Sequence, residues 1–296
     1  MDAAVTPGPV IPVASGPASE RSKARRETIR LLLHRRAFIL GNIIVIGWIV
    51  TAILGQRITP YDPFNDFATG HLPPSPEHWF GTDRLGRDVL SRVMVGSRDV
   101  LIVAPLAALL GVVAGAFLGL IMGYYRGWVD NLLSRVIEAF LALPVILVAL
   151  MTLVVLGSSP VVVIFVVGIL FTPIVARTVR SAVLSERELD YVTAAKLRGE
   201  TGLFILSREI FPNVLGPIVV EMTVRFGYAI FTVATLSFLG VGLQPPSPDW
   251  GLSVSEEYTN MISGVWWPTL FPAMAIASTV IAVNLIADAL QSVTSE

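Results

Sequence analysis

The sequence of 296 residues contains no cysteine and little charge. Without cysteine, the chain forms no disulfide and no thiolate metal site. Its three histidines, His34, His71 and His78, lie outside the long apolar runs, which argues against an imidazole-rich metal or proton site. Charged residues make up 15% of the chain, whereas roughly a quarter is usual for a globular protein. We therefore expect no metal centre, and we expect much of the chain to lie in an apolar environment.

The sequence also lacks the motifs of common hydrolytic chemistry. It has no G-x-x-x-x-G-K-[ST] segment, so the chain has no phosphate-binding loop of its own. Neither H-E-x-x-H nor G-x-S-x-G occurs, and no Ser-His-Asp set is evident. The net charge of −1 gives no sign of a nucleic-acid partner. The sequence predicts a protein that is not an enzyme and holds no cofactor.

What the sequence has in abundance is apolar residues. They make up 54% of the chain, and the mean hydropathy is +0.72, which is typical of a polytopic membrane protein. Six runs approach the ~20 residues that cross a bilayer as a helix. We predict an all-α membrane protein with six transmembrane helices, at Ala37–Gly55, Val100–Gly123, Val136–Leu156, Val161–Val179, Gly216–Gly240 and Pro268–Leu290. Gly111, Gly115 and Gly119 share one face of the second run and predict close contact with another helix.

A basic tail precedes the first apolar run. Residues 1–20 are rich in Pro, Ala, Gly and Ser, so we predict a disordered tail over residues 1–36 and a transmembrane domain over residues 37–296. A signal peptide is the competing interpretation. The first run has 19 residues, longer than the usual ~7–15 of a signal peptide, and no convincing small-residue cleavage site is evident. We interpret it as a retained first span.

The distribution of cationic residues predicts the orientation. Fifteen Lys and Arg fall on the side of the N-terminus, and five fall on the other side. Cytoplasmic segments carry the excess of positive charge. Both chain ends are therefore predicted to be cytoplasmic, with external loops at residues 56–99 and 243–267 and a cytoplasmic loop at residues 180–216. Trp266 and Trp267 fit an aromatic belt at the external membrane surface.

The cytoplasmic loop contains a polar segment, Ser185–Pro217, that predicts a helical hairpin. Ser185 and Glu188 have the spacing of a capping box, so a helix is predicted to begin there and to stop at Gly199. Thr201 is suited to cap a second helix, and Pro212 and Pro217 mark the return to apolar sequence. A hairpin of this size is more than a connection requires. We expect it to dock onto a partner.

Few charges lie in or near the apolar runs. Glu221 and Arg225 are four residues apart on one helix and are predicted to pair, and Glu138 follows closely after Arg135. All three are candidate pore charges, with a structural role as the alternative. Inverted repeats and paired buried carboxylates would favour an ion-coupled transporter acting alone, and we see neither. A purely structural membrane subunit is a third alternative, which the elaborate hairpin disfavours.

One external segment, GTDRLGRDVLSR, is rich in Gly and Asp. Its spacing differs from that of a calcium-binding loop. We interpret it as a solvated, salt-bridged turn leading into an amphipathic helix.

Three segments in order carry a family resemblance. Residues 190–199, DYVTAAKLRG, followed by IFPN at 210–213, resemble the "EAA" loop of bacterial ABC importer permeases. The turn around residues 80–92 and the segment at residues 237–251 resemble signatures of the C-type permease subunit of dipeptide and oligopeptide importers. The external signature residues are Gly81, Asp83, Gly86, Arg87, Asp88, Pro245, Pro246, Trp250 and Gly251.

The resemblance implies the type I ABC importer permease fold and a multi-pass protein of the bacterial plasma membrane. It implies a pore formed with a B-type permease subunit, ATP-binding subunits that hold ATP and Mg, and an extracytoplasmic substrate-binding protein. The implied substrate is a dipeptide or oligopeptide, with nickel, glutathione or haem importers as alternatives. Coupling to the ATPase is implied for Tyr191, Thr193, Ala194, Ala195, Lys196, Arg198, Gly199 and Pro212.

One residue departs from the family pattern. Thr193 stands where the family has an acidic residue at the head of the loop. A salt bridge from that position to the ATPase is therefore lost. Because exposed ion pairs contribute only ~0–1 kcal/mol, we expect docking to survive.

Overall fold

The computed structural model describes residues 32–65 and 68–294 and contains no β-strand within them. Most of the predicted disordered tail lies outside these residues. Five helices are long and apolar enough to cross a membrane, and a bent helix pair brings the number to six if it counts as one span. The five are α2 (Arg36–Ile58), α3 (Val89–Tyr125), α6 (Pro160–Arg187), α9 (Phe211–Phe238) and α11 (Trp267–Thr294). The all-α membrane fold is thus confirmed.

The third predicted span, Val136–Leu156, is not a continuous helix. It is divided into α4 (Gly127–Leu141) and α5 (Val145–Leu156), which meet at 85°. Pro144 lies at the break, where it has no N–H to donate and disfavours a helical conformation of Leu143. The predicted span is therefore bent at Pro144, and its two helices count as one span only as a broken pair.

The glycine-rich face of α3 packs against α6, as predicted. A Cβ on Gly111 would lie 2.8 Å from the carbonyl oxygen of Gly168, and one on Gly119 would lie 2.7 Å from that of Ala176. Even an alanine would therefore force the two helices apart. The small residues let the backbones approach closely, and α3 and α6 form the best-packed pair of spans in the described chain.

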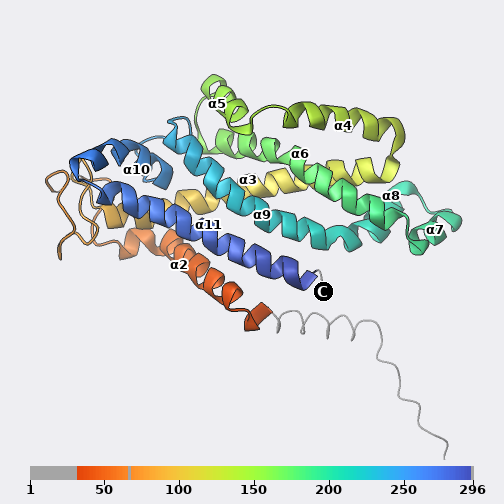
Figure 1. Ribbon diagram of the computed structural model, residues 1–296, viewed down its shortest axis with the longest axis horizontal. Coiled ribbons are helices and arrows are strands. Elements are labelled where there is room, and N and C mark those ends of the chain that lie inside the picture. Colours follow the sequence, from red (N-terminus) through yellow and green to blue (C-terminus); the bar gives the residue numbers. More distant parts are fainter. Residues whose placement is uncertain (1–31, 66–67, 295–296) are drawn as a thin grey trace, which may run out of the picture.

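The polar elements gather at the two ends of the helix bundle (Figure 1). One end carries α7 (Asp190–Leu197), α8 (Gly202–Phe204) and a π-helical turn, Ile205–Ile210. The other end carries the loop between α2 and α3, together with α10 (Trp250–Glu257) and a 3₁₀ turn, Tyr258–Ser263. We call these two ends of the bundle the α7 end and the α10 end. Arg35 donates to Ser292 at 2.5 Å, so the start of α2 lies beside the end of α11.

The helices extend into the segments predicted as loops. α3 begins eleven residues before the predicted span, at Val89, and α6 continues to Arg187. The segment between α6 and α8 is therefore a compact turn containing α7. Its short length leaves α7 in direct contact with the ends of the spans that flank it.

Candidate functional site

The candidate site at the α7 end begins where α6 stops. Ser185 lies inside α6, and its hydroxyl donates to the carbonyl oxygen of Ser181 at 3.3 Å. The predicted capping box at Ser185 and Glu188 was therefore wrong, because the helix of the span runs through it. A two-residue break, Glu188 and Leu189, separates α6 from α7, and no side chain caps α7.

The end of α7 is a glycine turn, as predicted. Gly199 has a φ of +79° and donates its N–H to the carbonyl oxygen of Lys196 at 3.0 Å. The N–H of Glu200 donates to the carbonyl oxygen of Ala195 at 3.2 Å, which completes a Schellman motif. Thr201 then accepts from the N–H of Phe204 and caps α8, also as predicted. The turn reverses the chain within a few residues.

α7 has one buried and one exposed face. Val192 and Ala195 are fully buried and pack in a cluster with Val183, Ile205 and Ile210. The opposite face is exposed and has no covering element in the described chain. It consists of Thr193, Ala194, Lys196, Leu197 and Arg198, and Leu197 is 85% exposed. α7 therefore presents one side that no other described element of the chain covers.

Tyr191 joins α7 to both flanking spans. Its hydroxyl donates to Glu186 at the end of α6 at 2.6 Å, and accepts from the amide of Asn213 in α9 at 3.1 Å. Burial and the bond to Glu186 raise the pKa of Tyr191 to about 12, so the hydroxyl keeps its proton at any physiological pH. Asn213 belongs to the IFPN segment that carries the family resemblance, but its bond to Tyr191 and the role of Glu186 could not be predicted, because these contacts depend on how three helices meet.

The chain enters α9 without a break. α8, the π-helical turn and α9 follow one another directly, and Pro212 occupies the first turn of α9. Pro217 lies inside α9. The helix thus continues through both prolines, and the apolar sequence that they precede forms α9.

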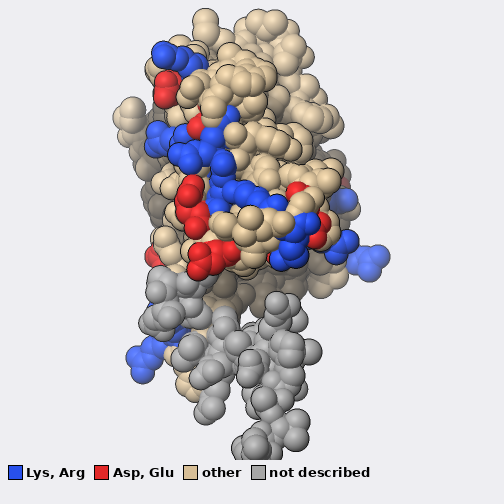
Figure 2. Space-filling view, turned by 90° about the vertical axis from the view of Figure 1, so that its right-hand side faces the viewer, with Lys and Arg blue, Asp and Glu red and all other residues tan. Residues whose placement is uncertain are grey.

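Charged side chains gather over the α7 end, onto which Figure 2 looks. Arg180 of α6 binds Asp130 of α4 through two bonds, at 2.5 and 2.6 Å. Arg187 donates to the carbonyl oxygen of Tyr124 at the end of α3. These bonds fix α4 and α3 to the same stretch of α6 that precedes α7.

The predicted pair on α9 is present. Arg225 donates to Glu221 at 2.9 Å, and Thr178 of α6 donates to the other oxygen of Glu221 at 2.8 Å. The guanidinium of Arg225 also lies 5.1 Å from the ring centre of Tyr228. Glu138 is on the exposed side of α4, away from this pair in the sequence and without an ion pair to any described residue. The structure thus unites Glu221 and Arg225 but leaves Glu138 apart.

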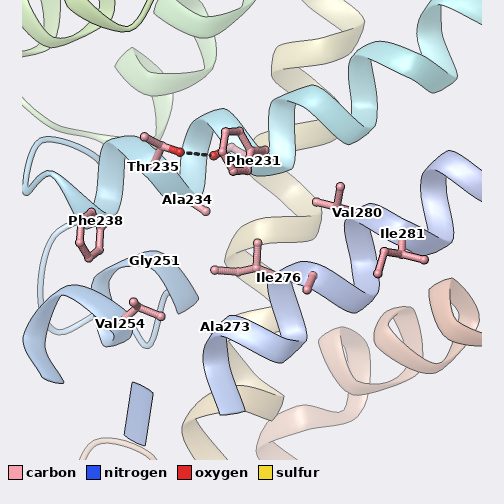
Figure 3. Close-up of a pocket in the computed structure, with 11 residues that line it drawn as sticks. Phe231, Ala234, Thr235, Phe238, Gly251, Val254, Ala273, Ile276, Val280 and Ile281 are labelled. Carbon is pink, nitrogen blue, oxygen red and sulfur yellow. Dashed lines mark hydrogen bonds between the residues drawn. The ribbon is translucent and has the colours of Figure 1, made fainter. Parts of the chain in front are cut away.

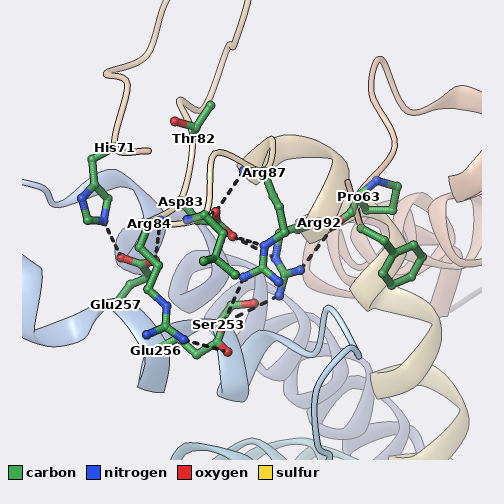
Figure 4. A network of polar contacts seen from close by, with 12 residues as sticks. Pro63, His71, Thr82, Asp83, Arg84, Arg87, Arg92, Ser253, Glu256 and Glu257 are labelled. Carbon is green, nitrogen blue, oxygen red and sulfur yellow. Dashed lines mark hydrogen bonds and ion pairs between the residues drawn. The ribbon is translucent and has the colours of Figure 1, made fainter. Parts of the chain in front are cut away.

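The α10 end contains a buried network of charges (Figure 4). Asp83 accepts from Arg87 at 2.7 Å, and Arg92 lies 3.6 Å away. These three side chains are at most 9% exposed. The prediction of a solvated turn was therefore wrong, whereas the predicted salt bridges are present. The network includes two acidic residues of α10, Glu256 and Glu257, and the further partners Arg84 and His71.

Burial of these charges is possible because the network is balanced. Three arginines face three carboxylates from two segments of the chain. Gly81 and Gly86, with φ of +73° and +78°, shape the turn that brings Asp83 and Arg87 together. Asp88 caps α3 by accepting from Ser91, and also binds His78 at 2.9 Å. The signature residues of this turn therefore form one structural unit.

The second external signature holds α10 against the spans. Trp250 is fully buried, donates to the carbonyl oxygen of Val93 at 2.8 Å and packs edge-on against Trp48. A Cβ on Gly251 would lie 2.3 Å from the carbonyl oxygen of Ala234, so only glycine permits this contact. The exposed Pro245 and Pro246 are joined by a cis peptide bond.

The two tryptophans of the predicted aromatic belt differ in position. Trp267 is only 7% exposed and donates to the carbonyl oxygen of Thr82 at 3.1 Å, so it belongs to the packing of the turn around Asp83. Trp266 is 44% exposed. The belt prediction is therefore wrong for Trp267, whose side chain points toward the turn rather than toward lipid.

Comparison with known proteins identifies the family. Residues 115–295 match the family described as binding-protein-dependent transport system inner membrane component. The chain belongs to this family. It is 37% identical to the glutathione transport system permease protein GsiD of Pectobacterium atrosepticum, over 90% of the chain and 89% of that protein. It is 39% identical to the dipeptide transport system permease protein DppC of Alkalihalophilus pseudofirmus, over 90% of the chain and 88% of that protein.

A third relative, DppC of Bacillus subtilis, is 36% identical over 88% of the chain and 82% of that protein. The family and the apolar helices together establish a multi-pass inner membrane protein. As a member of this family, the chain is the transmembrane component of a transport system rather than an enzyme acting by itself.

This transport component has one markedly apolar groove, between α9, α10 and α11 (Figure 3). Its volume is about 460 Å³, and Phe231, Phe238 and Ile276 are among its lining residues. The hydroxyl of Thr235 donates back to the carbonyl oxygen of Phe231, so it offers no free donor to the groove. In residues 32–65 and 68–294, no three His, Asp or Glu side chains are grouped so as to hold a metal ion.

Proposed function

We propose that this chain is the C-type permease subunit of an ATP-driven importer of short peptides. The observation that carries this proposal is the exposed face of α7, held between the ends of α6 and α9. A permease without a nucleotide-binding loop needs a surface through which an ATPase moves it. The α7 hairpin provides such a surface, and the family supplies the context of a transport system.

The coupling residues divide into two groups. Ala195 is buried and Gly199 forms the turn, so they shape the hairpin. Thr193, Ala194 and Lys196 are exposed and face the ATP-binding subunits, which hold ATP and Mg. Thr193 contributes at most a hydroxyl hydrogen bond there. Thr193→Glu should add an exposed ion pair worth ~0–1 kcal/mol, measured as tighter co-purification of the ATPase that weakens in high salt.

Peptides are the proposed substrates because relatives of the chain are named for dipeptide and glutathione transport. Glutathione is itself a tripeptide, so both names describe short chains with charged ends. Nickel and haem importers are the alternatives. An ion-coupled carrier acting alone is disfavoured, since the family consists of components of binding-protein-dependent systems.

The pore forms between this chain and a B-type permease subunit. Glu221 and Arg225 lie on α9 within an apolar span, where a charged pair is stable if it faces a partner helix or water rather than lipid. Glu138 on α4 is a further candidate. The α10 end, with its buried charge network, is the proposed external face. The binding protein docks there and delivers its peptide to the pore.

Reconstitution tests the proposal. The chain is assembled in liposomes with a B-type permease subunit, ATP-binding subunits and a substrate-binding protein from its own organism. We expect uptake of a labelled dipeptide that requires ATP and the binding protein, and no ATP hydrolysis by the chain alone. Uptake driven by a proton gradient without ATP would contradict it. Replacing the dipeptide with a nickel chelate or haem tests the alternative substrates.

A further inference from the structure

The coupling helix α7 is short and rests on few apolar contacts. Of its eight residues, only Val192 and Ala195 are buried. Apolar contact is not directional, so it holds α7 near the bundle without fixing its rotation or tilt. Hydrogen bonds are directional and fix an angle. The bonds that reach α7 from the flanking spans therefore decide how a push on its exposed face is passed on.

One hydroxyl makes the link to both spans. The Oη of Tyr191 donates to Oε1 of Glu186 on α6 at 2.6 Å and accepts from Nδ2 of Asn213 on α9 at 3.1 Å. The donor, Tyr191, stays protonated, and the acceptor is a carboxylate, which makes the bond to Glu186 stronger than one between neutral groups. In the described chain, this is the one side chain of α7 with hydrogen bonds to both α6 and α9.

Asn213 extends the link into the irregular start of α9. The same amide nitrogen donates to the carbonyl oxygen of Glu209 at 2.8 Å, inside the π-helical turn. Such turns disturb the regular helical ladder and often mark functional sites. Asn213 therefore connects the orientation of Tyr191 to the one segment near α7 whose backbone hydrogen bonding departs from the α-helical pattern.

We propose that Glu186, Tyr191 and Asn213 form a coupling clamp that makes α6 and α9 move together when an ATPase moves α7. These three are positioning residues: they touch neither peptide nor nucleotide, and act by fixing the angle of α7. The clamp rests on the proposed function, since it has meaning only if an ATPase docks on α7. Without it, α7 would rotate under load, and ATP hydrolysis would proceed with less movement of the spans.

The test uses the complete importer in liposomes and measures peptide imported per ATP hydrolysed. Tyr191→Phe removes only the hydroxyl, and the ring keeps its place beside the buried cluster. Asn213→Ala removes the amide that donates to the hydroxyl of Tyr191. Tyr125→Phe is the matched control, because Tyr125 is half-exposed and its hydroxyl has no hydrogen bond to a described residue. Co-purification of the ATPases verifies that each variant assembles.

We expect Tyr191→Phe to lower the ratio of peptide to ATP by about 10- to 100-fold, the loss of a hydrogen bond to a charged group. Asn213→Ala should lower it less, and the double variant should resemble Tyr191→Phe because both changes break one unit. Tyr125→Phe should match the wild type. A normal ratio in Tyr191→Phe would overturn the clamp, and so would equal losses of import and hydrolysis, which indicate mere destabilisation.

Failure of the proposed function gives a different result. If the wild-type assembly imports no peptide with ATP, the basis of the clamp is lost whatever the variants do. If the wild type imports peptide and the Tyr191→Phe ratio is unchanged, the function stands and the clamp alone is refuted.

Discussion

The turn after α7 depends on Gly199, whose φ of +79° lies in the left-handed region. For an L-residue with a side chain, this conformation costs about 1–2 kcal/mol, because its Cβ comes too close to the following carbonyl oxygen. A Cβ built on Gly199 meets no other atom within 4 Å, so contacts with the described chain add nothing. The cost of a substitution is therefore conformational, and its size follows from the residue type.

Gly199→Ala should shift the balance between the formed and the opened turn about 5- to 30-fold, since 1.4 kcal/mol is a factor of ten. Gly199→Asn should cost less, because Asn adopts this region more readily, and the β-branched Gly199→Val should cost more. The N–H groups of Gly199 and Glu200 close the turn, so their hydrogen exchange reports its opening. Exchange and peptide import should both follow the order Gly, Asn, Ala, Val.

Gly264 provides the matched control. Its φ is +85°, it too has open space around the missing Cβ, and it lies at the opposite end in the turn after α10. Gly264→Ala should carry the same local cost without changing the peptide imported per ATP. Wild-type exchange in Gly199→Ala would refute the conformational argument. If Asn impaired import as much as Val with normal exchange, the space beside Gly199 would be occupied by the ATPase.

Three further predictions concern the external network, the cap of α10 and the topology. Asp83→Asn weakens an acceptor for buried arginines and should lower thermal stability in detergent by about 3–5 kcal/mol, while Arg84→Ala, at a half-exposed side chain, should cost below ~1 kcal/mol. Burial raises the pKa of Asp249 from its usual 3.8 to about 6, so stability should fall as the pH rises between these values. Asp249→Asn keeps the cap and should abolish that fall, gaining up to ~3 kcal/mol near neutral pH; an unchanged pH profile would contradict this. A cysteine replacing Glu77 should react with an impermeant thiol reagent from outside and one replacing Arg208 only from inside, and the opposite labelling would reverse the predicted orientation.

The features that the sequence predicted correctly depend on neighbours within a few residues. Gly199 ends α7 because the left-handed conformation is a property of one residue, and Glu221 pairs with Arg225 because one helical turn separates them. The glycine face of α3 follows from helical spacing alone. For the glycine face, the sequence predicts close contact with another helix but does not show that this helix is α6.

The features that it missed depend on contacts between distant segments. The turn around Asp83 was predicted to be solvated, because the carboxylates of Glu256 and Glu257 that balance its arginines lie over 160 residues further along the chain. Trp267 was assigned to the membrane surface for the same reason, since Thr82 accepts its N–H. Position in the chain shows which residues are polar or aromatic, but not which of them find a buried partner.

Prolines show the limit of local reasoning most clearly. Pro105, Pro173, Pro217 and Pro272 all lie inside helices, whereas Pro144 breaks one. A proline removes one backbone hydrogen bond in each case. Neighbouring helices and side chains can compensate for that loss inside a bundle, and whether they do is decided by packing. Here the chain bends by 85° at Pro144, and α5 packs against the core through Ala149 and Leu153 while most of its residues are not buried.

The packing also indicates which of the two spans beside α7 moves further. In the most apolar stretches of α3 and α6, 50% of the residues are buried, and glycines bring the two backbones into contact. The corresponding stretch of the span Gly202–Phe238, which contains α9, is only 22% buried, and this span includes the π-helical turn. Shifting α6 would disturb close-packed backbone, whereas shifting α9 would disturb fewer contacts. A force entering through α7 should therefore move the clamped ends of α6 and α9 together, and displace the rest of α9 further than the rest of α6, which α3 holds in place. The bond between Thr178 and Glu221 joins α6 to α9 along this stretch.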